Sequence, residues 1–267
     1  MKRPIGIFDS GIGGLTVLKE ILNAMPGEDT IYLGDTARVP YGTKSAETVT
    51  RYSFENAKFL LKFDIKLLVV ACNTASAYCL PQLKEELSIP VIGVIEPGAK
   101  KAVEVTKAKR IGIIGTEGTI RSGAYFDAIK TIDQSIAVFT QPCPLFVPLA
   151  EEGWTNNQIA RMTAHAYLND IKKQWIDALI LGCTHYPLLK SIISDVMGNT
   201  VTLIDSGHET AAEVAKCLME KNLLKTISSG ESFHRFFVTD SPERFRQVGS
   251  RFMGTRLNNV ELVNLED

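Results

Sequence analysis

The stretch LLVVACNTAS at residues 67–76 is the most informative about the fold, because an apolar run leads directly into a cysteine and the start of a helix. A second stretch, ALILGCTHYP at residues 178–187, repeats the design. Both runs have the length and character of strands that are covered on two faces of a parallel sheet. Such sheets bind ligands at the carboxyl ends of their strands. Cys72 and Cys183 are therefore predicted to face one site.

Strands and helices alternate around the first of these stretches. A glycine-rich turn at residues 11–14 follows the first predicted strand, and Ser45 is expected to cap a later helix. A helix from about Thr74 is expected to bend or break near Pro81. This alternation predicts an α/β fold with a mainly parallel sheet. The predicted strands lie at residues 4–10, 30–35, 67–71 and 90–95, and the predicted helices at residues 15–25 and 45–63.

Three short matches indicate an internal duplication of about one domain's length. They occur in the same order in both halves of the chain, at offsets of 106, 108 and 111 residues. Chance is the alternative explanation for any one of them. The matches are IGI at residues 5 and 111, VP at residues 39 and 147, and the cysteines at 72 and 183.

The predicted fold is two pseudo-symmetric lobes, each a mainly parallel sheet flanked by helices, with the active site in the cleft between them. Residues 1–97 and 207–267 form the predicted first lobe, and residues 98–206 form the second. The piece that begins near residue 232 is too short to be a domain by itself. We expect it to pack on the first lobe.

The composition limits the classes of function. With 267 residues, 45% of them hydrophobic, the chain can bury a sizeable core, and its net charge of −1 does not indicate a nucleic acid or an anionic membrane as a partner. Residues 1–9 do not resemble a signal peptide, and no run approaches the roughly 18 apolar residues of a membrane span. The five cysteines lack the spacing of a disulfide or zinc framework. We therefore expect free thiols, no metal and a cytoplasmic location.

A cysteine at the start of a helix suits proton transfer. The pKa of a thiol, ordinarily near 8.5, falls beside a helix N-terminus or a cation. The backbone N–H groups there, with Asn73, Thr74 and Thr184, form a cradle suited to a carboxylate. Two acid–base groups on opposite sides of one carbon are what racemisation or epimerisation requires, and this chemistry needs no metal or organic cofactor.

Removing a proton next to a carboxylate concentrates negative charge on the carboxylate oxygens, so hydrogen-bond donors are needed. Loss of one comparable donor costs about 2.7 to 4 kcal/mol in a well-studied hydrolase. Asp9 near one thiol and His185 near the other are candidates to tune or relay protons, as is Glu151 on its own loop. The candidate donors are Ser10, Thr74 and Thr184.

Four motifs carry a family resemblance: FDSGIGG at residues 8–14, VPYG at 39–42, ACNTA at 71–75 and GCTHYP at 182–187. In this order and spacing they resemble the glutamate racemases, of the cofactor-independent aspartate/glutamate racemase superfamily, over nearly the whole chain. The resemblance implies two α/β lobes, interconversion of L- and D-glutamate without a cofactor, and supply of D-glutamate for peptidoglycan. It also implies frequent homodimers.

The resemblance implies roles for individual residues. Cys72 would abstract the proton from D-glutamate and Cys183 from L-glutamate, and the assisting residues would be Asp9, Glu151 and His185. The implied substrate contacts are Asp9, Ser10, Pro40, Tyr41, Gly42, Asn73, Thr74, Thr184 and His185.

Several alternatives stay open at the level of sequence. The chain fits a racemase of aspartate or another amino acid, a noncatalytic binding protein for acidic amino acids, or a redox protein with a reversible Cys72–Cys183 disulfide. A metal site formed by these cysteines and His185 would lack a fourth ligand and a zinc-like spacing. Asp35 and Asp205, at strand ends, fit either cleft residues or helix caps.

Overall fold

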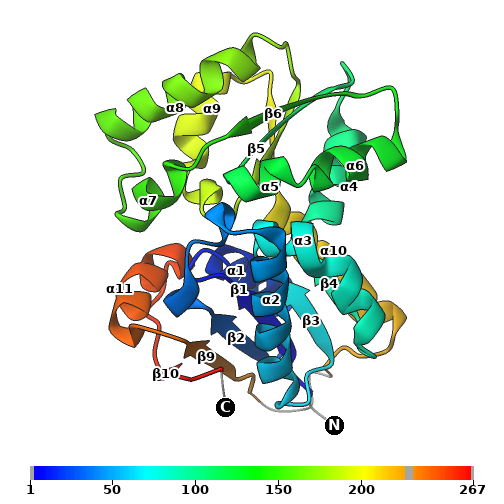
Figure 1. The fold of residues 1–267 in the computed structure, drawn as a ribbon, viewed down its shortest axis with the longest axis vertical. Helices are drawn as coiled ribbons and strands as arrows, with labels where there is room; N and C mark the ends of the chain where they lie inside the picture. The colour runs from blue at the N-terminus through cyan, green and yellow to red at the C-terminus, as the bar shows by residue number, and fades with distance from the viewer. Residues whose placement is uncertain (1–2, 226–230, 266–267) are drawn as a thin grey trace.

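A computed structural model describes residues 3–225 and 231–265, so Met1 and Lys2 of the N-terminal stretch lie outside the described residues, as do residues 226–230 and 266–267 of the predicted first lobe. The described residues form two sheets, each flanked by helices and placed one above the other along the long axis (Figure 1). Every strand pairing among them is parallel. The predicted α/β class is confirmed.

The first sheet has six strands in the order β10-β9-β2-β1-β3-β4. Side chains alternate across its two faces: Leu67 and Val69 join the core on one face, and Leu68 and Val70 join the core on the other. Both faces are covered, which explains the continuous apolar runs. The strands are β1 (Ile5–Asp9), β2 (Thr30–Gly34), β3 (Leu67–Val70), β4 (Val91–Gly93), β9 (His234–Val238) and β10 (Val260–Leu262).

The second sheet has four strands in the order β6-β5-β7-β8, which repeats the order β2-β1-β3-β4 of the first. The internal duplication is therefore visible in the topology. We call the six-stranded sheet with its helices the first lobe, and the four-stranded sheet with its helices the second lobe. The strands of the second are β5 (Arg110–Gly115), β6 (Ala137–Pro142), β7 (Ala178–Gly182) and β8 (Thr202–Asp205).

The predicted helices at residues 15–25 and 45–63 are present as α1 (Leu15–Ala24) and α2 (Ala46–Leu61). Ser45 caps α2, as predicted, because its side chain accepts a hydrogen bond from the backbone N–H of Thr48. The α-helices are α1 (Leu15–Ala24), α2 (Ala46–Leu61), α3 (Asn73–Glu86), α4 (Ile95–Val105), α5 (Glu117–Arg121), α6 (Ala124–Ile132), α7 (Phe146–Glu151), α8 (Gln158–Lys172), α9 (Lys190–Met197), α10 (Ser206–Glu220) and α11 (Pro242–Met253). Short 3₁₀ turns are η1 (Thr36–Arg38), η2 (Tyr41–Thr43) and η3 (Tyr186–Leu189).

Helix α3 contains Pro81 and is not interrupted there, so a break at this residue is ruled out, while a bend stays a prediction. Proline removes one backbone hydrogen bond from a helix. Leu80 and Leu83, beside it, are buried in the core of the first lobe, and tertiary packing of this kind supplies most of a helix's stability. Packing therefore outweighs the lost hydrogen bond.

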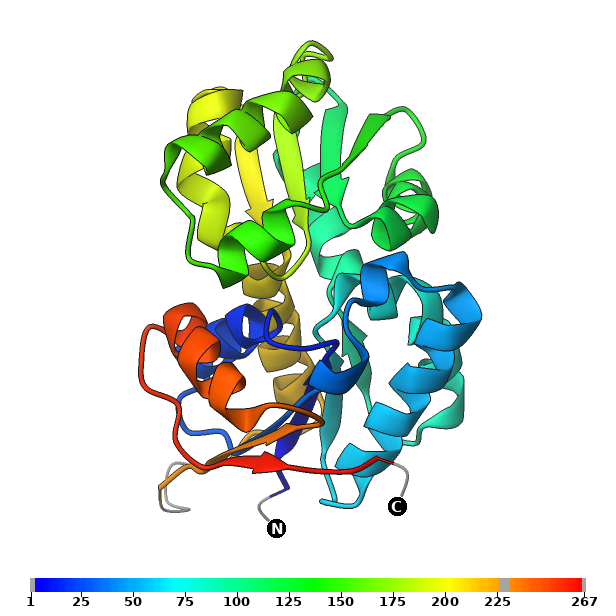
Figure 2. The same cartoon turned by 60° about the vertical axis from the view of Figure 1, so that its left-hand side comes forward.

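The C-terminal segment completes the first sheet. Strand β9 pairs with β2, β10 pairs with β9, and α11 packs on α1, so this segment lies beside the N-terminal strands (Figure 2). The predicted division of the chain at residues 97/98 and 206/207 stays a prediction, and it keeps each sheet within one lobe. No helix within residues 3–225 and 231–265 is both long and apolar enough to cross a membrane.

Candidate active site

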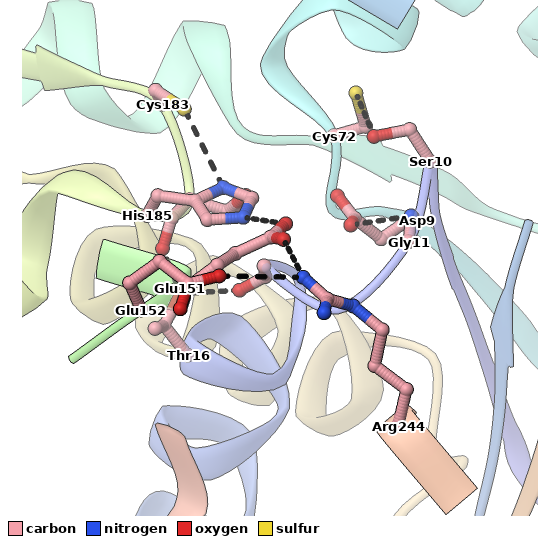
Figure 3. A network of polar contacts seen from close by, with 12 residues as sticks. Asp9, Ser10, Gly11, Thr16, Cys72, Glu151, Glu152, Cys183, His185 and Arg244 are labelled. Carbon is pink, nitrogen blue, oxygen red and sulfur yellow. Dashed lines mark hydrogen bonds and ion pairs between the residues drawn. The ribbon is translucent and has the colours of Figure 1, made fainter. Parts of the chain in front are cut away.

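The two cysteines stand just beyond the carboxyl ends of corresponding strands. Strand β3 ends two residues before Cys72, and β7 ends immediately before Cys183. The thiols come from different lobes, yet both line one cavity of about 70 Å³, which we call the central cavity. Figure 3 shows the two cysteines on either side of a network of polar side chains.

The central cavity brings together every predicted site residue except Asp9. Their roles in binding and catalysis stay predictions. Those that line it are Ser10, Pro40, Tyr41, Gly42, Cys72, Asn73, Thr74, Glu151, Cys183, Thr184 and His185. Five further lining residues were not predicted from the sequence, namely Gly11, Ile12, Val39, Thr116 and Val147.

The duplication relates two of these five residues to equivalent positions of the first lobe. Thr116 follows β5 as Ser10 follows β1, at the offset of 106 residues that separates the two IGI matches. Val147 belongs to the VP match with Val39. Equivalent positions of the two lobes therefore face the same cavity. Applying the duplication to the predicted Ser10 would have identified Thr116, whereas Val147 is equivalent to Val39, which was itself not predicted.

Cys72 lies at the N-cap of α3. Its sulfur accepts a hydrogen bond from the backbone N–H of Ala75 at 3.5 Å, and its thiol donates to Ser10 Oγ at 3.6 Å. Burial, followed by the negative charge of Asp9, raises the pKa of Cys72 to about 12. At neutral pH Cys72 is therefore a thiol, in a position to donate a proton.

Asp9 lies beneath this end of the site and is only 1% exposed. Its Oδ2 accepts a hydrogen bond from the backbone N–H of Gly11 at 2.9 Å, whereas its Oδ1 is buried with no hydrogen-bond partner among the described residues. Burial raises the pKa of Asp9, and the nearby His185 opposes that shift. An unsatisfied buried carboxylate oxygen is costly, and such atoms often serve a function.

The environment of Cys183 is different, because His185 contacts its sulfur and Glu151 contacts His185 in turn. His185 Nδ1 lies 3.8 Å from the Cys183 sulfur, and His185 Nε2 lies 3.2 Å from Glu151 Oε1. Burial alone would lower the pKa of His185, but the hydrogen bonds to Cys183 and Glu151 outweigh it and raise the pKa to about 10. The hydrogen bond from His185 lowers the pKa of Glu151. His185 is therefore an imidazolium held between two acceptors.

The loop around Pro40 is fixed by a buried carboxylate. Asp35 is fully buried, accepts a hydrogen bond from the Tyr41 hydroxyl, and pairs with Arg38 Nε at 2.7 Å. Asn56 Nδ2 also donates to the Tyr41 oxygen at 3.1 Å. The Tyr41 hydroxyl is thus committed to the protein, although its side chain lines the central cavity. Of the two strand-end acids, Asp35 anchors this loop and Asp205 caps α10.

Hydrogen bonds join the two lobes around the central cavity. Thr74 Oγ1 lies 2.9 Å from Thr116 Oγ1, and the Tyr125 hydroxyl donates to Asn73 Oδ1 at 2.7 Å. Two predicted substrate contacts, Asn73 and Thr74, therefore also hold the lobes together. Within the described part of the chain, no group of three or more His, Cys, Asp or Glu side chains is arranged to hold a metal ion.

Known proteins match this chain over nearly its full length. A family model described as Asp/Glu/Hydantoin racemase matches residues 5–214. The glutamate racemase of Geobacter metallireducens is 60% identical over 264 residues, covering 99% of this chain and 97% of that protein. The glutamate racemase of Enterococcus faecalis is 47% identical and covers the same shares. The matched region includes both cysteine motifs.

Solved structures agree in fold. The crystal structure of a glutamate racemase from Bacillus anthracis has a TM-score of 0.95 and 43% identity, covering 99% of each chain. The glutamate racemase of Francisella tularensis, solved in complex with D-glutamate, has a TM-score of 0.93 and 41% identity, covering 99% of this chain and 98% of that one. Both lobes are thus shared with these proteins.

Proposed function

The chain belongs to the Asp/Glu/hydantoin racemase family, and from this membership we infer that it is a glutamate racemase, an isomerase that interconverts L- and D-glutamate. The observation that carries the inference is the pair of thiols from different lobes on one small cavity. Relatives named glutamate racemase, which match 97% of their own length, support glutamate as the substrate.

Proton transfer runs between the two sulfurs. In the L-to-D direction, the Cys183 thiolate removes the α-proton of L-glutamate and becomes a thiol, and the electron pair left on Cα is delocalised into the carboxylate. The Cys72 thiol then delivers its proton to the opposite face of Cα and becomes a thiolate. The high pKa of Cys72, caused by burial and Asp9, supports its role as the proton donor. The imidazolium of His185 can donate to a thiolate at Cys183.

Groups around the thiols suit the carboxylate of an amino acid. The backbone N–H groups of Asn73 and Thr74 begin helix α3, and a helix N-terminus favours a carboxylate. Asp9 does not line the central cavity, and its negative charge acts on the site through the neighbouring Cys72, whose pKa it raises. These features support binding that holds Cα between the two sulfurs.

Racemisation assays test the proposal. Chiral chromatography after incubation with L-glutamate is expected to show equal amounts of both enantiomers, with little conversion of L-aspartate. Cys72→Ala and Cys183→Ala are each expected to lower kcat/KM by at least about 10²- to 10⁴-fold, the usual contribution of one acid–base group. Conversion of aspartate but not glutamate would support the rival substrate. Binding of glutamate without conversion would support a binding protein.

We also propose a cytoplasmic location, a role in supplying D-glutamate for peptidoglycan, and a homodimer, all on the basis of family resemblance. Light scattering during size-exclusion chromatography tests the homodimer, because a dimer has twice the 29.4 kDa mass of the chain. A single species at the chain mass would contradict it.

A further inference from the structure

We propose that helix α11 of the first lobe positions the Glu151–His185 pair of the second lobe, and that Arg244 is the residue that orients the Glu151 carboxylate. This inference rests on the proposed function, because it concerns the proton transfer at Cys183. The family resemblance assigns nothing to α11 or to Arg244. In this role Arg244 is a positioning residue, which acts through Glu151.

Arg244 and His185 divide the two oxygens of Glu151 between them. Arg244 Nη2 lies 3.3 Å from Glu151 Oε2, while Glu151 Oε1 lies 3.2 Å from His185 Nε2. Figure 3 shows the Arg244 guanidinium reaching the carboxylate from the side away from Cys183. The carboxylate of the Glu151 side chain can rotate easily about its last torsion. A cation bound to one oxygen fixes the direction of the other.

Two further contacts come from the same helix. Arg251 Nη2 donates to the main-chain oxygen of Glu151 at 2.7 Å, so α11 holds both the backbone and the side chain of that residue. The Phe252 ring lies edge-on to the imidazole of His185, with ring centroids 5.4 Å apart and planes at 88°. Three residues of α11 therefore contact Glu151 or His185, the two side chains that are linked by hydrogen bonds to Cys183.

The sequence of α11 explains why it presents these groups together. Phe245, Val248 and Phe252 are buried in the core of the first lobe and set the orientation of the helix. Arg244 and Arg251 are seven residues apart, which places them within about 20° of each other around a helix. The helix thus fixes itself to one lobe and extends two guanidinium groups to the other.

This arrangement makes the Cys183 half of the site depend on the lobes lying close together. Glu151 and His185 belong to the second lobe, whereas α11 belongs to the first, where it connects β9 to β10 along the sequence. The ion pair contributes little to stability, because the Arg244 side chain is 55% exposed and such pairs are worth only about 0–1 kcal/mol. We therefore expect the ion pair to affect the orientation of Glu151 and His185 during proton transfer, and to affect stability little.

Arg244→Gln tests the proposal. We expect kcat/KM to fall about tenfold, less than the roughly 100-fold loss that a 1 Å displacement of a reacting group can cause. The loss must be equal for L- and D-glutamate, because the two enantiomers have equal free energies. Arg244→Lys, which keeps the positive charge, should recover part of the activity. Wild-type activity in Arg244→Gln would overturn the proposal.

The same helix offers a matched control. Arg246 pairs with Glu243 one turn away within α11, so Arg246→Gln makes the same change in charge without touching Glu151. We expect wild-type kcat/KM in this variant. A tenfold loss there would show that the general charge of α11 matters, and it would refute a specific role for Arg244.

A double-mutant cycle tests whether Arg244 acts through Glu151. Arg244→Gln should cause no further loss in a Glu151→Gln background, since the carboxylate that it orients is gone. Glu152 is the other acid near Arg244, at 3.8 Å, and Glu152→Gln should leave activity almost unchanged. Additive losses with Glu151→Gln, or a tenfold loss in Glu152→Gln, would contradict the proposal.

The pH profile gives a readout that a purely structural role would not change. Hydrogen bonds and charge from His185 and Arg244 lower the pKa of Glu151, so removing Arg244 should raise that pKa and move the acidic limb of kcat/KM to higher pH. An unmoved limb would count against the proposal. If wild-type protein does not racemise glutamate, the proposed function fails. If wild-type protein racemises glutamate and the Arg244 variants do so equally well, only this inference fails.

Discussion

Gly13→Ala is expected to disable the Cys183 half of the site through a single added methyl group. A Cβ at residue 13 would lie 2.2 Å from Thr184 Oγ1 and 2.5 Å from His185 Nδ1, whereas ordinary van der Waals contact begins at 3.4 Å. The imidazole would have to move by about 0.9 Å (3.4 − 2.5). A displacement of about 1 Å can cost about 100-fold in rate. We therefore expect kcat/KM for L-glutamate to fall about 100-fold.

His185 has little room to move without losing its partners. Its two nitrogens lie 3.8 Å from the Cys183 sulfur and 3.2 Å from Glu151 Oε1. Overpacking of this kind costs about 1–3 kcal/mol, less than the roughly 5–15 kcal/mol by which domains are stable, so the variant should still fold. The fall in rate should therefore appear in protein whose circular dichroism spectrum is that of wild type.

Gly27→Ala is the matched control for the Gly13 experiment. A Cβ at residue 27 meets no atom within 4 Å, so the same chemical change should leave kcat/KM unaltered. Initial rates are measured by chiral chromatography for both variants. Wild-type activity in Gly13→Ala would show that the position of His185 beside Gly13 is not needed for catalysis, contrary to this prediction.

Three further predictions concern other parts of the structure. Protonated His185 should stabilise the fold most below its ordinary pKa of 6.5, and this contribution should disappear as the pH rises through about 10. In urea titrations, the difference in free energy of unfolding between wild type and His185→Gln should therefore shrink as the pH rises. A difference that grows with pH would contradict the raised pKa of His185. Asp35→Asn should raise KM several-fold with little change in kcat, since Asp35 anchors the loop that lines the cavity; an unchanged KM counts against that role. Lys66→Met leaves Glu28 buried, at 3% exposure, without its cation and should lower the free energy of unfolding by about 3–5 kcal/mol, whereas Lys173→Met, in an exposed pair, should change it little; equal effects would refute the distinction.

The sequence was most informative where one local pattern determines the structure. The apolar runs before Cys72 and Cys183 predicted buried parallel strands, and the place where parallel strands end predicted that both thiols would share a site. Three short matches were enough to predict two similar lobes, because a duplicated fold preserves its strand order. Ser45 was predictable as a cap because capping depends on neighbours three residues away.

Contacts between distant segments could not be predicted in this way. Arg244 lies 93 positions from Glu151 in the sequence, and the residue pattern of α11 does not predict which residue of the other lobe it contacts. Tyr41 was expected to contact the substrate, but no local rule indicated that its hydroxyl would bind Asp35. The uninterrupted helix through Pro81 depends on packing against the first sheet, which propensity alone does not include.

Isotope transfer in heavy water tests the two-thiol mechanism most directly. Wild-type protein is incubated with L-glutamate in deuterium oxide, and the D-glutamate formed at early times is analysed by mass spectrometry. Because the proton delivered by Cys72 exchanges with solvent and differs from the one removed by Cys183, we expect deuterium at Cα in nearly all of the product, while the remaining L-glutamate keeps its hydrogen. D-glutamate that retains the original hydrogen would mean that one group both removes and returns it, and would contradict the two-thiol mechanism.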